Sequence, residues 1–172
     1  MEMQRDLFGH DAPAPAGPAG LSLVEDAVSP AEEAELAAHI DAAPLEPFKF
    51  GQWRGKRLTF SYGSGYDFER GRIAEAPALP DWLLALRVQL GARMGMEAEA
   101  LVQALLIRYD PGAGIGWHRD RPQYGEVLGL SLSAPAILRL RRRTEGGFER
   151  RSIHLPQRSL YRLSGEVRWE WE

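Results

Sequence analysis

The chain has 172 residues, 44% of them hydrophobic, and a formal net charge of −3, so it fits one domain with a real core and is no obvious polyanion binder. It has no cysteine, which excludes disulfides, thiolate metal sites and cysteine nucleophiles and leaves His, Asp and Glu as metal ligands. No run approaches the length of a membrane span and no signal-peptide pattern opens the sequence, so we expect a cytoplasmic protein without a membrane partner.

The first part of the chain predicts a tail, a strand and a helix. Residues 1–20 are expected to be a flexible tail, because the Ala, Pro and Gly that alternate from Ala12 to Gly20 resist both helix and sheet. Leu21 to Val28 reads as a short strand. Ser29 followed by Pro30 is an N-cap with proline at the first helical position, and the helix should run to about Ala42.

The next region combines aromatic and basic residues. Phe48 to Tyr62 is rich in strand-forming residues interleaved with Lys and Arg, a combination that suits a flipped or single-stranded base. A hairpin with one face in the core is an equally good interpretation. Gly63 to Gly71 predicts a loop with Tyr66 and Phe68 at its middle, for which a lid role is plausible.

A second amphipathic helix is expected from Pro80 to about Gly95, and Leu101 to Tyr109 then reads as a buried strand. The turn Asp110-Pro111-Gly112 follows it. Short strands with turn residues between them fill the second half, at 127–133, 136–143, 150–155 and 159–163. After a turn at Ser164-Gly165, the final residues should place Trp169 and Trp171 on one face. This pattern predicts a mainly β fold with flanking helices, a sandwich or double-stranded β-helix (jelly roll).

A His-x-Asp pair, His118 and Asp120, is the central candidate for chemistry. If the segment is a strand, the two side chains share a face, and they supply two thirds of the facial triad that binds non-haem Fe(II). Alone, the pair is a weak signal, since a surface histidine beside a solvated aspartate gives the same pattern.

Only two of the 21 basic residues are lysines, Lys49 and Lys56, so the chain is rich in arginine. Arg139, Arg141 and Arg143 share one face of a predicted strand. They form either a stripe that faces phosphates or an ordinary solvated sheet face.

The order of these motifs resembles the AlkB family of Fe(II)- and 2-oxoglutarate-dependent dioxygenases. The resemblance is strong from Leu101 to Arg143 and looser elsewhere in 21–172, the expected dioxygenase domain. It rests on the run Leu106-Ile107-Arg108-Tyr109-x-Pro111-Gly112-Ala113, His118-x-Asp120, the strand 127–132, Pro135-Ala136-Ile137 and the Ser164-Gly165 turn. It implies the jelly-roll fold and oxidative dealkylation of N-alkylated nucleobases in DNA or RNA.

The resemblance also implies site residues and cofactors. His118 and Asp120 match two Fe(II) ligands, and Tyr109 matches a tyrosine that binds 2-oxoglutarate. An asparagine that often lies two positions before this tyrosine is replaced by Ile107. The region that corresponds to the substrate lid supplies the candidate substrate contacts, which are Trp53, Arg57, Tyr62 and Tyr66. Single-stranded or alkylated nucleic acid is the implied partner.

The resemblance further implies a second histidine and an arginine after the Ser164-Gly165 turn, and the sequence ends at Glu172 without them. His154 lies one strand too early for this ligand, and Glu170 and Glu172 are poor substitutes. We expect a domain incomplete at its C-terminus, with its last strands missing, either as a shortened form of a longer enzyme or through natural loss. The alternatives for function are the same oxygenase chemistry on a protein or small molecule, or a catalytically silent binding module.

Overall fold

A computed structural model describes residues 17–50, 53–67 and 72–172. The helices are α1 (Pro30–Ala42), α2 (Asp81–Met94), a 3-10 turn η1 (Ala98–Ala100) and α3 (Gly165–Trp169). The strands are β1 (Leu21–Val24), β2 (Glu46–Phe50), β3 (Trp53–Tyr62), β4 (Ser64–Asp67), β5 (Arg72–Glu75), β6 (Ala104–Arg108), β7 (Val127–Leu130), β8 (Ala136–Thr144), β9 (Gly147–Leu155) and β10 (Leu160–Leu163). None of the helices in these described ranges is long and apolar enough to cross a membrane.

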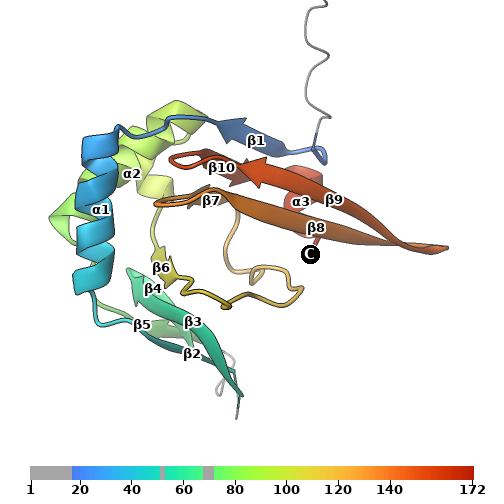
Figure 1. The fold of residues 1–172 in the computed structure, drawn as a ribbon, viewed down its shortest axis with the longest axis horizontal. Coiled ribbons are helices and arrows are strands. Elements are labelled where there is room, and N and C mark those ends of the chain that lie inside the picture. The colour runs from blue at the N-terminus through green and yellow to red at the C-terminus, as the bar shows by residue number, and fades with distance from the viewer. Residues whose placement is uncertain (1–16, 51–52, 68–71) are drawn as a thin grey trace, which may run out of the picture.

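The strands form antiparallel sheets that pair distant parts of the chain. One sheet has the order β1-β10-β7, with Leu21 opposite Leu163, and a second has the order β2-β3-β6. The remaining strands form two hairpins, β4-β5 and β8-β9. Figure 1 shows the long β8-β9 hairpin beside the β1-β10-β7 sheet, with the β2-β3-β6 sheet below. The prediction of a mainly β architecture with flanking helices is confirmed.

The two faces of the β1-β10-β7 sheet support two hydrophobic cores. On one face, Leu160 packs with Leu90 and Met94 of α2. On the other face, Leu163 packs against a core formed by Leu140, Val167 and Trp171 of β8 and the C-terminal segment. Because side chains alternate along a strand, β10 contributes to both layers, as a central strand of a sandwich should.

The predicted helices are confirmed, and their ends follow local chemistry. Ser29 and Glu32 form a reciprocal capping box at the start of α1. Within α1, Glu33 is buried and accepts hydrogen bonds from the backbone N–H of Ser133 and the side chain of Gln157, at 2.7 and 2.9 Å. Helix α1 is thereby tied to loops that lie 100 and 124 residues away in the sequence.

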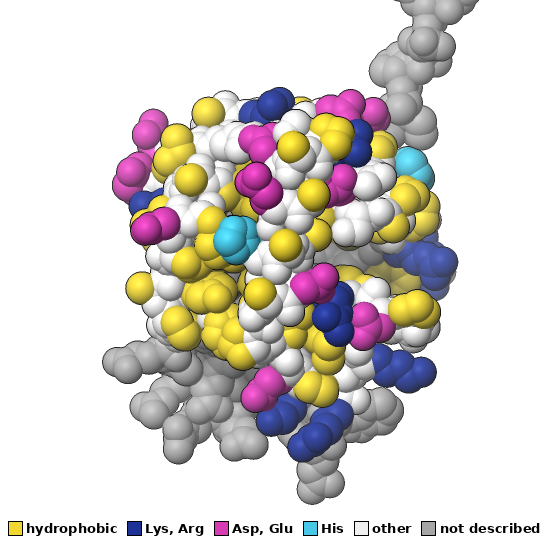
Figure 2. Space-filling model, turned by 60° about the vertical axis from the view of Figure 1, so that its left-hand side comes forward, with side chains coloured by type: hydrophobic (Ala, Val, Ile, Leu, Met, Phe, Trp, Pro, Cys, Tyr) yellow, Lys and Arg dark blue, Asp and Glu magenta, His cyan; other side chains and the backbone are white. Residues whose placement is uncertain are grey.

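His39 lies on the exposed surface of α1. Its ring stacks on Trp82 of α2, with 4.7 Å between ring centroids. The α1–α2 side of the molecule carries acidic side chains scattered among hydrophobic ones, with basic side chains mainly towards its edges (Figure 2). Among the residues that the structure describes, His39 belongs to no group of three or more His, Asp or Glu side chains that could hold a metal ion.

Two loop and strand predictions are wrong. The expected loop at Gly63–Gly71 contains strand β4, which pairs with β5, because the following segment offers it a partner of matching length; residues 68–71 lie outside the described part. The expected strand carrying His118 is irregular backbone between β6 and β7. Its Asp-Pro-Gly turn, closely spaced glycines and Pro122 oppose a regular strand.

The two ends of the domain also differ from expectation. Trp169 and Trp171 do not share a face, because the segment forms the short helix α3; Trp169 is 49% exposed and Trp171 only 3%. Residues 17–20 were assigned to the tail, yet the carbonyls of Ala19 and Gly20 accept hydrogen bonds from Val167 and Ser164. The packed structure therefore begins before Leu21, while residues 1–16 lie outside the described ranges.

Candidate metal and substrate site

His118 and Asp120 lie side by side in the irregular segment that connects β6 and β7. Their Nε2 and Oδ1 atoms are 3.7 Å apart, and both side chains are partly exposed. The Nδ1 atom of His118 lies 2.9 Å from the carbonyl oxygen of Gly116. If Nδ1 carries the proton and donates to this carbonyl, Nε2 presents its lone pair on the side of Asp120. The backbone at Gly116, not a strand, orients the imidazole.

The two groups shift each other's pKa in opposite directions. Contact with Asp120 raises the pKa of His118, and partial burial opposes this shift. Contact with His118 lowers the pKa of Asp120, again against burial, with smaller contributions from the charges of Arg168 and Arg57. Asp120 is therefore a carboxylate at neutral pH, which is the form that binds a metal cation.

Arg168 of α3 anchors the backbone that follows the pair. Only 3% of this arginine is exposed. Its Nε donates to the carbonyl of Gly125 at 2.7 Å, and its Nη2 donates to the carbonyls of Arg121 and Tyr124. A planar guanidinium with several donors can satisfy three carbonyls of one loop at once. We call α3 and residues 121–125 the clamp wall of the site.

The side chains on either side of His118 contact the C-terminal region. Arg119 donates to the carbonyl of Glu170 at 3.1 Å, and the ring of Trp117 lies under the guanidinium of Arg141 at 4.6 Å. Arg141 in turn forms an ion pair with Glu172 at 3.0 Å. The segment that carries His118 and Asp120 therefore runs between the β2-β3-β6 sheet and the β8-β9 hairpin, next to residues 170–172 (Figure 1).

Arg57 of β3 approaches the pair from the opposite sheet. It is 9% exposed, and its guanidinium stacks on Phe48 at 4.0 Å. Its Nε and Nη1 atoms are buried without a hydrogen-bond partner among the described residues. Its charge acts on both His118 and Asp120. A buried cation whose N–H donors have no partner costs free energy unless another group accepts from them. Strand β3, which carries Arg57, is called the open wall of the site.

Tyr161 of β10 forms an apolar floor beneath the pair. Burial raises the pKa of its hydroxyl to about 12, with further contributions from Asp120 and Tyr109. Gly129, directly opposite on β7, makes room for the ring: a Cβ there would lie 2.1 Å from the ring carbon that bears the hydroxyl. Tyr109 is 47% exposed and lies near enough to Tyr161 to influence its charge.

The predicted site residues divide into three groups. His118, Asp120, Arg57 and Tyr109 are brought into one neighbourhood. Tyr62 lies five residues along β3 from Arg57, so strand alternation puts it on the other face, where its ring meets Phe60. The side chains of Trp53 and Tyr66 lie outside the described part of the structure.

Sequence reasoning missed Arg168 and Tyr161. Only Gly129, an isolated glycine within an apolar strand, signalled the close approach of Tyr161.

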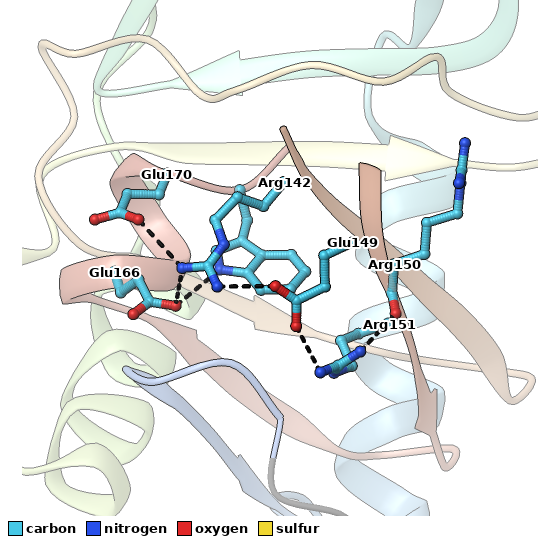
Figure 3. Close-up of polar contacts among 7 residues, drawn as sticks. Arg142, Glu149, Arg150, Arg151, Glu166 and Glu170 are labelled. Atoms are coloured by element: carbon cyan, nitrogen blue, oxygen red, sulfur yellow. Dashed lines mark hydrogen bonds and ion pairs between the residues drawn. The ribbon is translucent and has the colours of Figure 1, made fainter. Parts of the chain in front are cut away.

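A second polar cluster holds α3 against the β8-β9 hairpin. Arg142 of β8 bonds Glu149, Glu166 and Glu170 at 2.8, 2.9 and 3.3 Å. Glu149 also pairs with Arg151, and the indole N–H of Trp171 donates to Glu166 (Figure 3). Since Arg168 belongs to α3, this cluster secures the clamp wall from behind.

The donor set suits a hard divalent or Fe(II) ion, because imidazole and carboxylate are its usual ligands. In the described ranges no third His, Asp or Glu joins His118 and Asp120. Glu172 and Glu170 are engaged by Arg141 and Arg142. His154 lies on β9 opposite Ile137 of β8, and not in the connection between β6 and β7 that carries His118 and Asp120. His118 and Asp120 are thus two candidate metal ligands.

Comparison with known proteins identifies the class. A family model of the 2OG-Fe(II) oxygenase superfamily matches residues 24–172, which is most of the chain. The chain belongs to this superfamily, and His118 and Asp120 fall within the matched region. The predicted class is confirmed.

The more particular relatives are AlkB homologues. The "Alkylated DNA repair protein ALKBH8 homolog" of Arabidopsis thaliana is 28% identical over 171 residues, covering 88% of this chain and 49% of that protein. The "Probable RNA/DNA demethylase ALKBH6" of Danio rerio is 35% identical over 107 residues, covering 62% of this chain and 43% of that protein. The chain spans less than half the length of both. A solved structure, "The structure of OsALKBH1", shares the fold with a TM-score of 0.62 at 12% identity, covering 88% and 83% of the two chains.

Proposed function

We propose that this chain carries out Fe(II)- and 2-oxoglutarate-dependent oxidative dealkylation of N-alkylated nucleobases in DNA or RNA. The observation that carries the proposal is the His118–Asp120 pair, 3.7 Å apart, in a domain of the 2OG-Fe(II) oxygenase superfamily. The printed names of the AlkB relatives support a nucleic-acid substrate. When bound, iron and 2-oxoglutarate would allow O2 to oxidise an N-alkyl carbon. The products are succinate and CO2 from 2-oxoglutarate, and an aldehyde and the dealkylated base from the substrate.

The residues of the chain have separate roles in this proposal. His118 and Asp120 bind the iron, and the Gly116 carbonyl keeps Nδ1 of His118 protonated so that Nε2 is available. Tyr109 donates its hydroxyl hydrogen bond to 2-oxoglutarate, as the resemblance implies. Tyr161 stays neutral at physiological pH, because its pKa is about 12, and keeps the floor beneath Asp120 free of water.

Arg57 is the substrate-facing cation of the open wall. Its unpaired Nε and Nη1 donors favour a substrate that presents a carbonyl oxygen or a phosphate. Trp53, Tyr62 and Tyr66 remain the proposed aromatic contacts of the lid, where a flipped base would stack. Of these three, Tyr62 has the weakest support, because strand alternation separates it from Arg57.

A metal titration tests the site and a turnover assay tests the reaction. Mn(II) binding, followed by electron paramagnetic resonance, should be lost in His118→Ala and Asp120→Ala and retained in His39→Ala, the matched control on α1. With Fe(II), 2-oxoglutarate and O2, N-methylated single-stranded DNA or RNA should stimulate succinate formation over the unmethylated oligonucleotide. No stimulation by any methylated nucleic acid would exclude the nucleobase substrate.

The second candidate is the same chemistry on a protein side chain or a small molecule. The net charge of −3 favours it, since general attraction to a polyanion is weak. Salt dependence separates the two, because binding through phosphates weakens steeply as salt rises. The third candidate, a catalytically silent binding module, requires that metal binding survive loss of both His118 and Asp120 or be absent altogether.

A further inference from the structure

The β8-β9 hairpin has two faces of very different chemistry. In its register Arg141 is opposite Arg150, Arg143 is opposite Phe148, and Arg139 lies on the same face by alternation. We call these five residues the outer face. Figure 3 shows the side chain of Arg150 pointing away from the cluster that Arg142 forms on the other face.

Charge is balanced on one face and unbalanced on the other. Arg142 meets three carboxylates on the inner face. On the outer face Arg141 pairs with Glu172, whereas no ion pair joins Arg139, Arg143 or Arg150 to any carboxylate in the described ranges. Two arginines directly opposite each other on neighbouring strands repel. The stability of the hairpin therefore does not account for this arrangement.

Aromatic rings hold these arginines in place. The ring of Phe148 lies 4.5, 5.4 and 5.6 Å from the guanidinium carbons of Arg141, Arg143 and Arg150. The ring centroid of Trp117 lies 4.6 Å from the guanidinium carbon of Arg141. Because Trp117 precedes His118, the outer face continues directly into the segment that carries His118 and Asp120. Stacking of this kind limits the freedom of the guanidinium groups. Arg141 already donates to Glu172, whereas Arg139, Arg143 and Arg150 are exposed.

We infer that the outer face binds the sugar-phosphate backbone of single-stranded nucleic acid whose target base enters the site at His118. The inference rests on the proposed nucleic-acid substrate and adds the surface that holds it. Arg139, Arg143 and Arg150 are exposed on one face of the hairpin and lack carboxylate partners in the described ranges, so they form a basic surface suited to a polyanion; Arg141 between them is paired with Glu172. Arginine forks bind phosphate bidentately, and exposed rings stack on bases.

The test compares a triple variant, Arg139→Gln/Arg143→Gln/Arg150→Gln, with the unchanged chain. Binding of a fluorescent single-stranded oligonucleotide is measured by anisotropy over a series of salt concentrations. Loss of three phosphate contacts should lower the slope of log K against log salt by about 2 and weaken binding at least tenfold at low salt. Arg143→Gln alone should lower the slope by about 0.7, whereas the matched control Arg93→Gln on α2 should leave it unchanged.

The possible outcomes separate this inference from the proposed function. If the unchanged chain binds the oligonucleotide and the triple variant keeps the full slope, the outer face is not the binding surface, although the substrate class stands. If the unchanged chain binds no oligonucleotide, both fail. If polyglutamate of equal charge competes as well as the oligonucleotide, the occupant is an acidic protein segment and the inference is overturned. Urea unfolding of the triple variant should match the unchanged chain, which shows that lost binding is not lost folding.

Discussion

Two buried arginines flank the His118–Asp120 pair, and they differ in how their donors are used. On the clamp wall, Arg168 donates to three backbone carbonyls. On the open wall, Arg57 is nearly as buried but leaves Nε and Nη1 unpaired in the described structure. The charges of both act on Asp120. A buried cation whose donors are satisfied costs less stability than one whose donors are left unpaired.

The largest effect should come from Arg168→Gln. Glutamine cannot reach three carbonyls, so residues 121–125 lose their anchor, and the free energy of unfolding should fall by about 3–5 kcal/mol. Urea denaturation measures this loss, and Arg93→Gln on the surface of α2 serves as the control. A loss below about 1 kcal/mol would mean that the clamp wall holds without its arginine.

Gly129→Ala should have the next largest effect. A methyl group at this position overlaps the ring of Tyr161, so the floor must shift, at a cost of about 1–3 kcal/mol. The displaced ring should also weaken Mn(II) binding by His118 and Asp120. Gly114→Ala, where an added methyl meets nothing within 4 Å, is the matched control. Equal stability of the two variants would show that Tyr161 is free to move.

Arg57→Met should change stability little, by less than about 1 kcal/mol in either direction, because it removes an unpaired charge and keeps an apolar stem. Binding should suffer instead: we expect KM for the methylated oligonucleotide to rise while Mn(II) affinity is retained. A loss of stability as large as that of Arg168→Gln would show that the two walls are alike.

The smallest effect should come from Glu149→Gln, behind the clamp wall. The pair with Arg142 holds the pKa of Glu149 below its ordinary 4.5. The stabilisation is therefore present above pH 4.5 and disappears as pH falls through the lowered folded value. The variant should have a lower Tm than the unchanged chain at pH 7, and the difference should shrink towards pH 3. A Tm difference independent of pH would exclude the charge as its cause.

Much of the fold could be predicted from sequence because the signals are local. The Ser29-Pro30 cap, the apolar stripe of α2 and the Gly-rich turn between β8 and β9 each act within a few residues. The His118–Asp120 pair was found, although for a wrong reason: the Gly116 carbonyl orients it and no strand does. Arg168 was missed because its partners lie 43–47 residues away, and no local pattern marks a contact at that distance.

The pairing of β1 with β10 has a consequence for how the chain folds. Leu21 is hydrogen-bonded in register with Leu163, so the first strand has no partner until nearly the whole chain has been made. At ribosomal rates this delay is on the order of ten seconds, during which the segment stays unpaired. Such non-local contacts also slow spontaneous folding. We therefore expect refolding to proceed in at least two phases, with β1 and the residues before it docking last, and the β10 amides that bond to β1 to be protected from hydrogen exchange only in the second phase.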